Sequence, residues 1–180
     1  MDRQQLLAAL NAHTAINDLE AKHRQRTIAF VSQHENCCDR HLTSGHITAS
    51  SWIIDETCDH ALLTQHRKRE RWLQLGGHVE DDQDILTAAL REAREESGLA
   101  DIHTVTTAIF YIDVHQIPAR KQEPEHFHYD VRFLFQARRG DNLTISDESH
   151  DLRWFTTAEL HNFSGDESIN RMGGKMTTLN

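Results

Sequence analysis

A strongly patterned helix over residues 84–97 is the sequence feature that most constrains the fold. Small and aliphatic residues recur along it at helical spacing and form one candidate core stripe: Leu86, Leu90, Ala93 and Ser97. Carboxylates that can cap the helix and complement its dipole lie at its start: Asp81, Asp82 and Asp84. Gly98 follows, where a left-handed terminating residue is favoured. Because a helix with one apolar face must be covered, the neighbouring segments decide the architecture.

Those neighbouring segments are mostly strand-like. Runs rich in β-branched and aromatic residues predict strands over 46–55, 60–65, 72–75, 102–117, 126–138 and 152–155. Helical spacing of leucines predicts helix over residues 3–34, residues 35–45 are expected to be a loop, and further helices are expected from residue 156 onward. Strands around one strong helix, with helices at both ends, predict an α/β domain. We expect a helical extension over residues 1–45 and the main domain over 46–180.

Charge and composition limit the class of partner. The 180 residues carry a formal net charge of −9, which argues against a nucleic-acid partner but leaves room for a small phosphorylated substrate. No apolar run is long enough to span a bilayer, so no membrane association is expected. The first residues do not resemble a signal or transit peptide, and three cysteines make a poor disulfide framework. We therefore expect a cytoplasmic protein.

Three glutamates of the central helix, Glu92, Glu95 and Glu96, share one side of it. An isolated stripe of this kind is usually a solvated face. However, Glu92 and Glu96 are like charges four residues apart, which is unfavourable without a compensating cation, and Arg91 can pair with Glu95 only in the poorer orientation. Mg²⁺ prefers carboxylate oxygens and bridges to substrate phosphates. The glycines before the helix can bring backbone close to a metal or phosphate.

With its flanks, this helix resembles the Nudix box. Gly77 corresponds to the opening glycine, Arg91 and Glu92 to the Arg-Glu pair, and Glu95 and Glu96 to the double glutamate. Gly98 and Leu99 correspond to the closing glycine and aliphatic residue. The match departs at Gln83, which replaces the first glutamate, and at Ala93, which is smaller than the usual aliphatic. Asp82 or Asp84 could take over the supporting work of that first glutamate.

The resemblance implies an α/β/α sandwich with a mixed sheet, and Mg²⁺- or Mn²⁺-dependent hydrolysis of a diphosphate linkage in a nucleoside diphosphate derivative or similar small molecule. It implies that Glu92, Glu95 and Glu96 hold the metal, with Gly76 offering its backbone carbonyl. The family often adds an acid from outside the box. Glu148, six residues before Trp154, is the candidate for that catalytic role, and an ordinary loop glutamate is the equal alternative.

Two further groups of residues are candidates for substrate binding. His126, His128, Asp130 and Arg132 alternate along one strand face, which could bind a transition metal; we favour a polar face that lines the substrate cleft. A basic run before the box offers Arg67 and Arg69 for substrate phosphates, with Gly77 beside them, and its alternative is a solvated loop.

Other functions remain open at this point. A Nudix-like domain that senses a ligand without catalysis is favoured by Gln83 and opposed by the intact glutamates. Isomerase chemistry on a related fold is suggested only superficially by Cys37 and Cys38. The N-terminal helices could cover the active site or mediate a homodimer.

Overall fold

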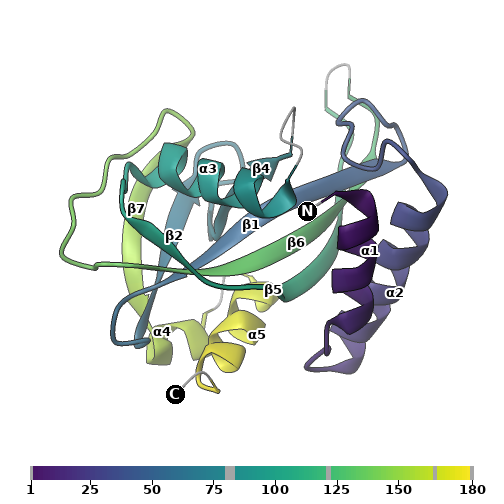
Figure 1. Ribbon diagram of the computed structural model, residues 1–180. Coiled ribbons are helices and arrows are strands. Elements are labelled where there is room, and N and C mark those ends of the chain that lie inside the picture. The colour runs from purple at the N-terminus through teal and green to yellow at the C-terminus, as the bar shows by residue number, and fades with distance from the viewer. Residues whose placement is uncertain (1, 80–83, 121–122, 164–165, 179–180) are drawn as a thin grey trace. The chain divides into compact units, whose positions relative to one another are not determined.

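The fold is built from five helices and seven strands among the residues that the computed structural model describes, 2–79, 84–120, 123–163 and 166–178 (Figure 1). The helices are α1 (Arg3–Ala12), α2 (Asp18–Gln33), α3 (Ile85–Ser97), α4 (Thr157–His161) and α5 (Glu167–Met176). The strands are β1 (Gly45–Ile54), β2 (His60–His66), β3 (Arg71–Leu73), β4 (Leu75–His78), β5 (Ile102–Ile117), β6 (His126–Ala137) and β7 (Ser149–Thr156).

The strands form one sheet with the order β3-β2-β1-β6-β5, in which β4 also pairs with β1 and β7 also pairs with β2. Strand β2 is antiparallel to β1, β3 and β7, with Leu62 opposite Ile53 on one side and Trp154 on the other. Every residue of β1 is buried, which is typical of a strand covered on both faces. The α/β class is therefore the one that the sequence predicts.

Contacts divide the chain into two compact units. The first comprises Met1–Ala49, Gly77–Ala89 and Ala108–Phe133, and the second comprises Ser50–Gly76, Leu90–Thr107 and Leu134–Asn180. Strands β1, β4, β5 and β6 and helix α3 contribute residues to both units.

In the first unit, α2 packs against β5 and β6. The ring of Phe30 stacks on Tyr129 with centroids 4.1 Å apart. Glu20 is fully buried and accepts a hydrogen bond from the backbone N–H of Ile112 at 3.1 Å. The predicted helix over 3–34 is interrupted between Ala12 and Asp18. Asn17 caps α2 there by accepting from the N–H of Glu20, so the chain turns and starts a second helix.

In the second unit, helices α4 and α5 pack against each other. Gly173 of α5 permits this approach, since a Cβ there would lie 2.7 Å from the Cβ of Leu160. Figure 1 shows α5 on the opposite side of the sheet from the end of α3. Ile169, Met172 and Met176 give α5 its buried side.

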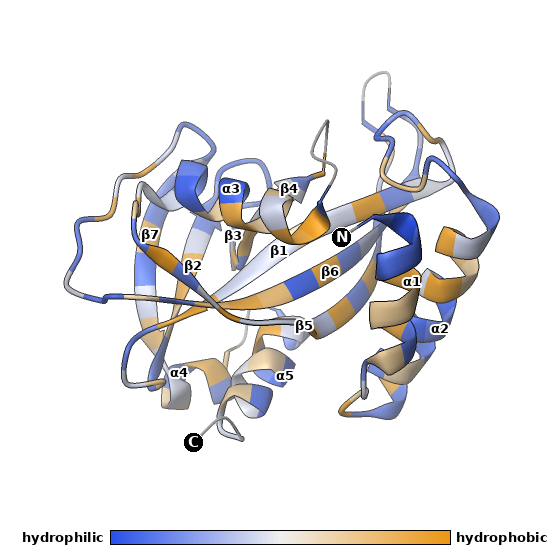
Figure 2. Ribbon diagram, viewed as in Figure 1, coloured by the Kyte–Doolittle hydropathy of each residue, from blue (hydrophilic) through white to orange (hydrophobic). Residues whose placement is uncertain are grey.

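Most expected element bounds agree with the structure. Helix α3 covers the predicted segment, and strand β5 coincides with the predicted 102–117. The expected strand 72–75 is instead two short strands separated at Gln74. Figure 2 shows hydrophobic and hydrophilic residues alternating along β6, as its sequence predicts. Within the described part of the chain, no helix has the length and apolar character that crossing a membrane requires.

Candidate active site

Both ends of helix α3 are fixed by the residues that the sequence singled out. The carboxylate of Asp84 accepts a hydrogen bond from the N–H of Leu86 at 2.9 Å, which makes it the N-terminal cap. Gly98 has a φ of +71°, as expected for the residue that ends the helix. Immediately beside it, the N–H of Thr144 donates to the carbonyl of Ser97 at 2.8 Å. Asp81, Asp82 and Gln83 lie outside the described residues.

Glu96 is the buried member of the glutamate stripe. It is 7% exposed, although a carboxylate is rarely buried without a partner. Its one hydrogen bond among the described residues comes from the N–H of Gly76 at 3.3 Å. Burial, followed by repulsion from Glu92, raises the pKa of Glu96 to about 8, and Glu148 and Glu95 add to this repulsion. A site that gathers this much negative charge around a buried oxygen is chemically suited to a cation.

Glu92 and Glu95 are both held by Arg91. Its Nη1 lies 2.9 Å from Oε1 of Glu92 and 3.0 Å from Oε2 of Glu95. The two carboxylates differ in exposure: the side chain of Glu92 is 15% exposed and that of Glu95 is 60% exposed. Arg91 therefore offsets part of the repulsion within the stripe, and Glu95 is its most solvated carboxylate.

Gly76 and Gly77 lie in strand β4, where Gly76 precedes the box and Gly77 opens it. Gly76 has a φ of +149°, a conformation that favours glycine, and its N–H faces the carboxylate of Glu96. The amide of Gly76 thus contacts Glu96, and the expected role of its carbonyl as a metal ligand stays a prediction. Gly77 is half-buried in the same strand.

Glu148 and the basic run lie side by side in the second unit. The N–H of Arg67 donates to the carbonyl of Glu148 at 2.9 Å, and Nε of Arg67 donates to the carbonyl of Ser149 at 2.7 Å. Lys68 extends its Nζ to within 3.6 Å of Oε1 of Glu148. Arg69 is half-buried in the same turn. The turn thus fixes the backbone of the segment that carries Glu148.

The carboxylate oxygens of Glu92, Glu95, Glu96 and Glu148 are hard donors, and the first three come from one face of a rigid helix. The burial of Glu96 among like charges fits a hard divalent cation, because such an ion would offset the repulsion that raises the pKa of Glu96.

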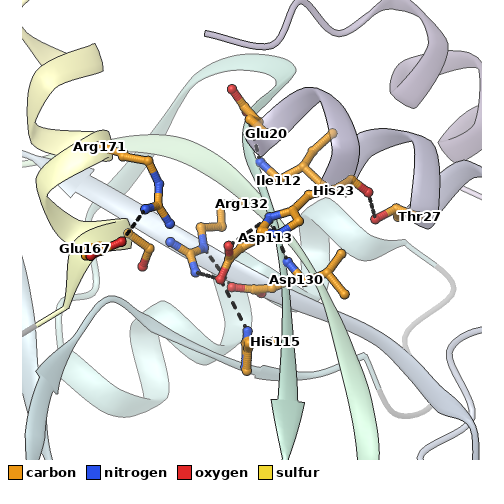
Figure 3. Close-up of polar contacts among 12 residues, drawn as sticks. Glu20, His23, Thr27, Ile112, Asp113, His115, Asp130, Arg132, Glu167 and Arg171 are labelled. Carbon is orange, nitrogen blue, oxygen red and sulfur yellow. Dashed lines mark hydrogen bonds and ion pairs between the residues drawn. The ribbon is translucent and has the colours of Figure 1, made fainter. Parts of the chain in front are cut away.

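The second predicted group lies in the first unit and forms a buried ion-pair network. Nε of Arg132 lies 2.7 Å from Oδ2 of Asp130, and both residues are almost fully buried. Figure 3 shows Asp113 contacting Arg132, His23 and His115. Burial raises the pKa of Asp113, but hydrogen bonds from His115 and His23 outweigh this effect and hold that pKa well below its usual range. This network fixes the strand face from which His126 and His128 project.

His126 and His128 belong to a larger group that the sequence alone did not reveal. We define the histidine cluster as five rings with neighbouring centroids 4.7–5.6 Å apart: His46, His78, His115, His126 and His128. Burial, followed by repulsion from its neighbours, lowers the pKa of His46 to about 4 and that of His128 to about 2. The rings of His46 and His128 are therefore neutral at pH 7.

The chain belongs to the Nudix family: residues 45–172 match the NUDIX domain. This match extends far beyond the box and confirms the predicted resemblance.

One sequence relative and several solved structures resemble this chain. An uncharacterized Nudix hydrolase of Bacillus subtilis, YvcI, is 24% identical over 110 residues, which are 59% of this chain and 65% of that protein. The match thus spans less than two thirds of that relative's length. A Nudix-family hydrolase from Clostridium perfringens has a TM-score of 0.54 at 24% identity, covering 75% of this chain and 98% of that one.

Two further structures share the fold at lower identity. The dihydroneopterin triphosphate pyrophosphohydrolase of E. coli has a TM-score of 0.56 at 13% identity, covering 74% of this chain and 96% of that one. A C. elegans Ap4A hydrolase has a TM-score of 0.54 at 16% identity, with the same coverage. These likenesses confirm the predicted Nudix-type α/β fold, with its mixed sheet, and say nothing of this chain's substrate.

Proposed function

We propose that the protein is a metal-dependent pyrophosphohydrolase that cleaves a diphosphate linkage in a nucleoside diphosphate derivative or similar small molecule. The supporting observation is the carboxylate of Glu96, which is buried beside Glu92 and near Glu148 with a strongly raised pKa. A structural role does not explain why a helix concentrates acids at one buried point, whereas metal binding does. Family membership supports the hydrolase class.

Each candidate site residue of the second unit has a proposed task. Glu92 and Glu96 are the principal holders of Mg²⁺ or Mn²⁺, with Glu95 and the carbonyl of Gly76 as additional ligands. The bound ion would neutralise phosphate oxygens and make a coordinated water more acidic.

Arg91 orients two of these carboxylates, so that they approach the ion already arranged. Glu148 is the proposed general base: its carboxylate accepts the proton of the water that attacks phosphorus. Arg67 and Arg69 are proposed to hold the substrate's phosphates, since guanidinium groups can bind their oxygens in pairs.

A ligand-sensing domain without catalysis is the second candidate. The observation that favours it is Gln83, which stands where the family carries a glutamate. A structural neighbour of 12% identity with a TM-score of 0.50 is the Nudix domain of Shewanella oneidensis NrtR, complexed with ADP ribose. A sensor would bind such a nucleotide and leave it intact.

The decisive experiment is a hydrolysis panel of nucleotide sugars, dinucleoside polyphosphates and nucleoside triphosphates, each with Mg²⁺ or Mn²⁺. We expect metal-dependent turnover of at least one class, and a loss of at least about 100-fold in kcat/KM for Glu96→Gln. The matched control is Glu167→Gln, because that side chain is 91% exposed on α5 and belongs to no proposed site. Tight nucleotide binding without turnover under either metal would favour the sensor.

Glu148→Gln tests the general base separately. If Glu148 accepts the proton, the variant loses kcat while its metal affinity changes little, and the acidic limb of the pH–rate profile disappears. If the pH–rate profile of this variant is unchanged, Glu148 is an ordinary loop residue and is not the general base.

A further inference from the structure

Three residues of the histidine cluster, His46, His78 and His128, form what we call the histidine triad. One ring nitrogen from each lies within 4.8 Å of those of the other two. The sheet brings these residues together. His46 lies near the start of β1, next to Gly45. Strand β1 pairs with β4, which carries His78, and with β6, which carries His128. All three belong to the first unit, whereas the glutamates of the proposed active site belong to the second.

His46 shows that the triad lacks an ordinary structural explanation. His46 is only 1% exposed, and neither of its ring nitrogens has a hydrogen-bond partner among the described residues. A neutral imidazole has one N–H donor and one acceptor nitrogen, and leaving a buried polar group unsatisfied costs about 1–3 kcal/mol. Buried histidines that serve only structure normally satisfy these groups. A ligand that binds ring nitrogens would remove this cost.

Two other members of the histidine cluster, His126 and His115, have an oxygen atom as the partner of Nδ1. Nδ1 of His126 donates to the carbonyl of Pro124 at 2.8 Å, and Nε2 of His126 forms a hydrogen bond of 3.3 Å with Nε2 of His128. His115 directs its Nδ1 toward Oδ2 of Asp113 at 3.4 Å (Figure 3). Carbonyl or carboxylate partners on the outer nitrogen fix the tautomer and rotation of histidines around metals.

We propose that the histidine triad binds a d-block dication of the zinc class, with imidazole nitrogens as its ligands in place of the carboxylates of α3. Neutral imidazole nitrogens suit Zn²⁺ and its neighbours, whereas Mg²⁺ selects oxygen. Zinc–nitrogen bonds of about 2.0–2.1 Å put tetrahedral ligands roughly 3.4 Å apart, so the ring nitrogens need to approach one another by up to about 1.4 Å. His78 and His128 are half-buried, and their side chains can make this adjustment. The bound ion would join β1, β4 and β6.

The test measures metal binding by the untagged full chain after EDTA treatment, with Co²⁺ and Zn²⁺ as probes. We expect one equivalent of Co²⁺ to produce visible d–d absorption, and excess Mg²⁺ to leave that absorption in place. His78→Ala is expected to weaken Zn²⁺ binding, measured by calorimetry, at least about 100-fold. Exposed His103 lies outside the histidine cluster, so His103→Ala is the matched control and should bind like the wild type.

Two further variants keep the inference refutable. His128→Gln replaces a different member of the triad, and circular dichroism of each metal-free variant establishes that it is folded. Glu96→Gln should retain the Co²⁺ absorption, because its carboxylate belongs to the other site. The inference is overturned if the wild type binds neither probe, if both triad variants bind like the wild type, or if only Glu96→Gln removes binding. Failure of this site would leave the hydrolysis panel unaffected.

Discussion

Glu96→Gln should stabilise the metal-free protein at alkaline pH, although the same change should lower kcat/KM at least about 100-fold. The pKa of Glu96 in the folded state is about 8, against an ordinary value of 4.5. Between these values the unfolded chain releases the proton of Glu96 while the folded chain keeps it. Stability therefore falls as pH rises from 4.5 to 8, and the loss is complete above the folded pKa. This loss is absent when residue 96 cannot ionise.

The size of the effect follows from linkage. Integrating over this pH range gives a ceiling of about 4 kcal/mol at pH 8, and relaxation of the folded site would reduce it to about 2 kcal/mol. At pH 4 the ceiling is only a few tenths of a kcal/mol. The amide oxygen of the glutamine can still accept the N–H of Gly76, so the variant keeps that hydrogen bond.

The assay is urea denaturation in EDTA at pH 4.5, 6.5 and 8.0. We expect the difference in unfolding free energy between Glu96→Gln and the wild type to grow with pH, and Glu167→Gln to show no such growth. Saturating Mg²⁺ at pH 8 should stabilise the wild type and leave Glu96→Gln unchanged. A difference that stays within about 0.5 kcal/mol across this range would refute the reasoning from burial and repulsion.

Three other substitutions test the supporting structure. Gly98→Ala should lower the free energy of unfolding by about 1–3 kcal/mol in thermal denaturation, because its φ is +71° and an added Cβ would lie 2.5 Å from the Cβ of Thr144. Gly140→Ala is the near-neutral control, since a Cβ added there meets no described atom within 4 Å. Arg132→Ala should cost about 3–5 kcal/mol in urea denaturation, because two buried aspartates lose their partner, and a cost below about 1 kcal/mol would contradict this account. Glu20→Ala should speed amide exchange in α1 and α2, since this carboxylate accepts three hydrogen bonds, and unchanged exchange there would show that it does not hold these helices.

The elements with strong local patterns could be predicted from the sequence. Strand β5 is a long run of β-branched and aromatic residues, and α3 has a cap at Asp84 and a stop at Gly98. The predicted core stripe of α3 is only partly correct: Ala93 and Ser97 are buried, whereas Leu86 and Leu90 are half-buried. The glutamates of the box could be identified because they are close in sequence and share one helix face. In these places local propensity and tertiary packing favour the same structure.

The parts that depend on strand pairing could not be predicted in this way. His46, His78 and His128 lie far apart in sequence, and only the order of β4, β1 and β6 brings them together. The burial of Arg132 between two aspartates was likewise hidden, because alternation assigns a strand face without saying what covers it. His78, directly after the two glycines of the box, was the one local signal that could have led to the triad.

The hydrogen bonds between Arg67 and the Glu148–Ser149 backbone matter for anyone who would redesign this protein's substrate preference. One hydrogen bond joins main-chain atoms of the two segments and the other comes from the guanidinium of Arg67, so the basic turn and the acidic segment behave as one module although Arg67 and Ser149 are 82 residues apart. Grafting either loop alone from a homologue would disturb these hydrogen bonds and displace the loop that was not exchanged. Chimeras should therefore exchange both segments at once.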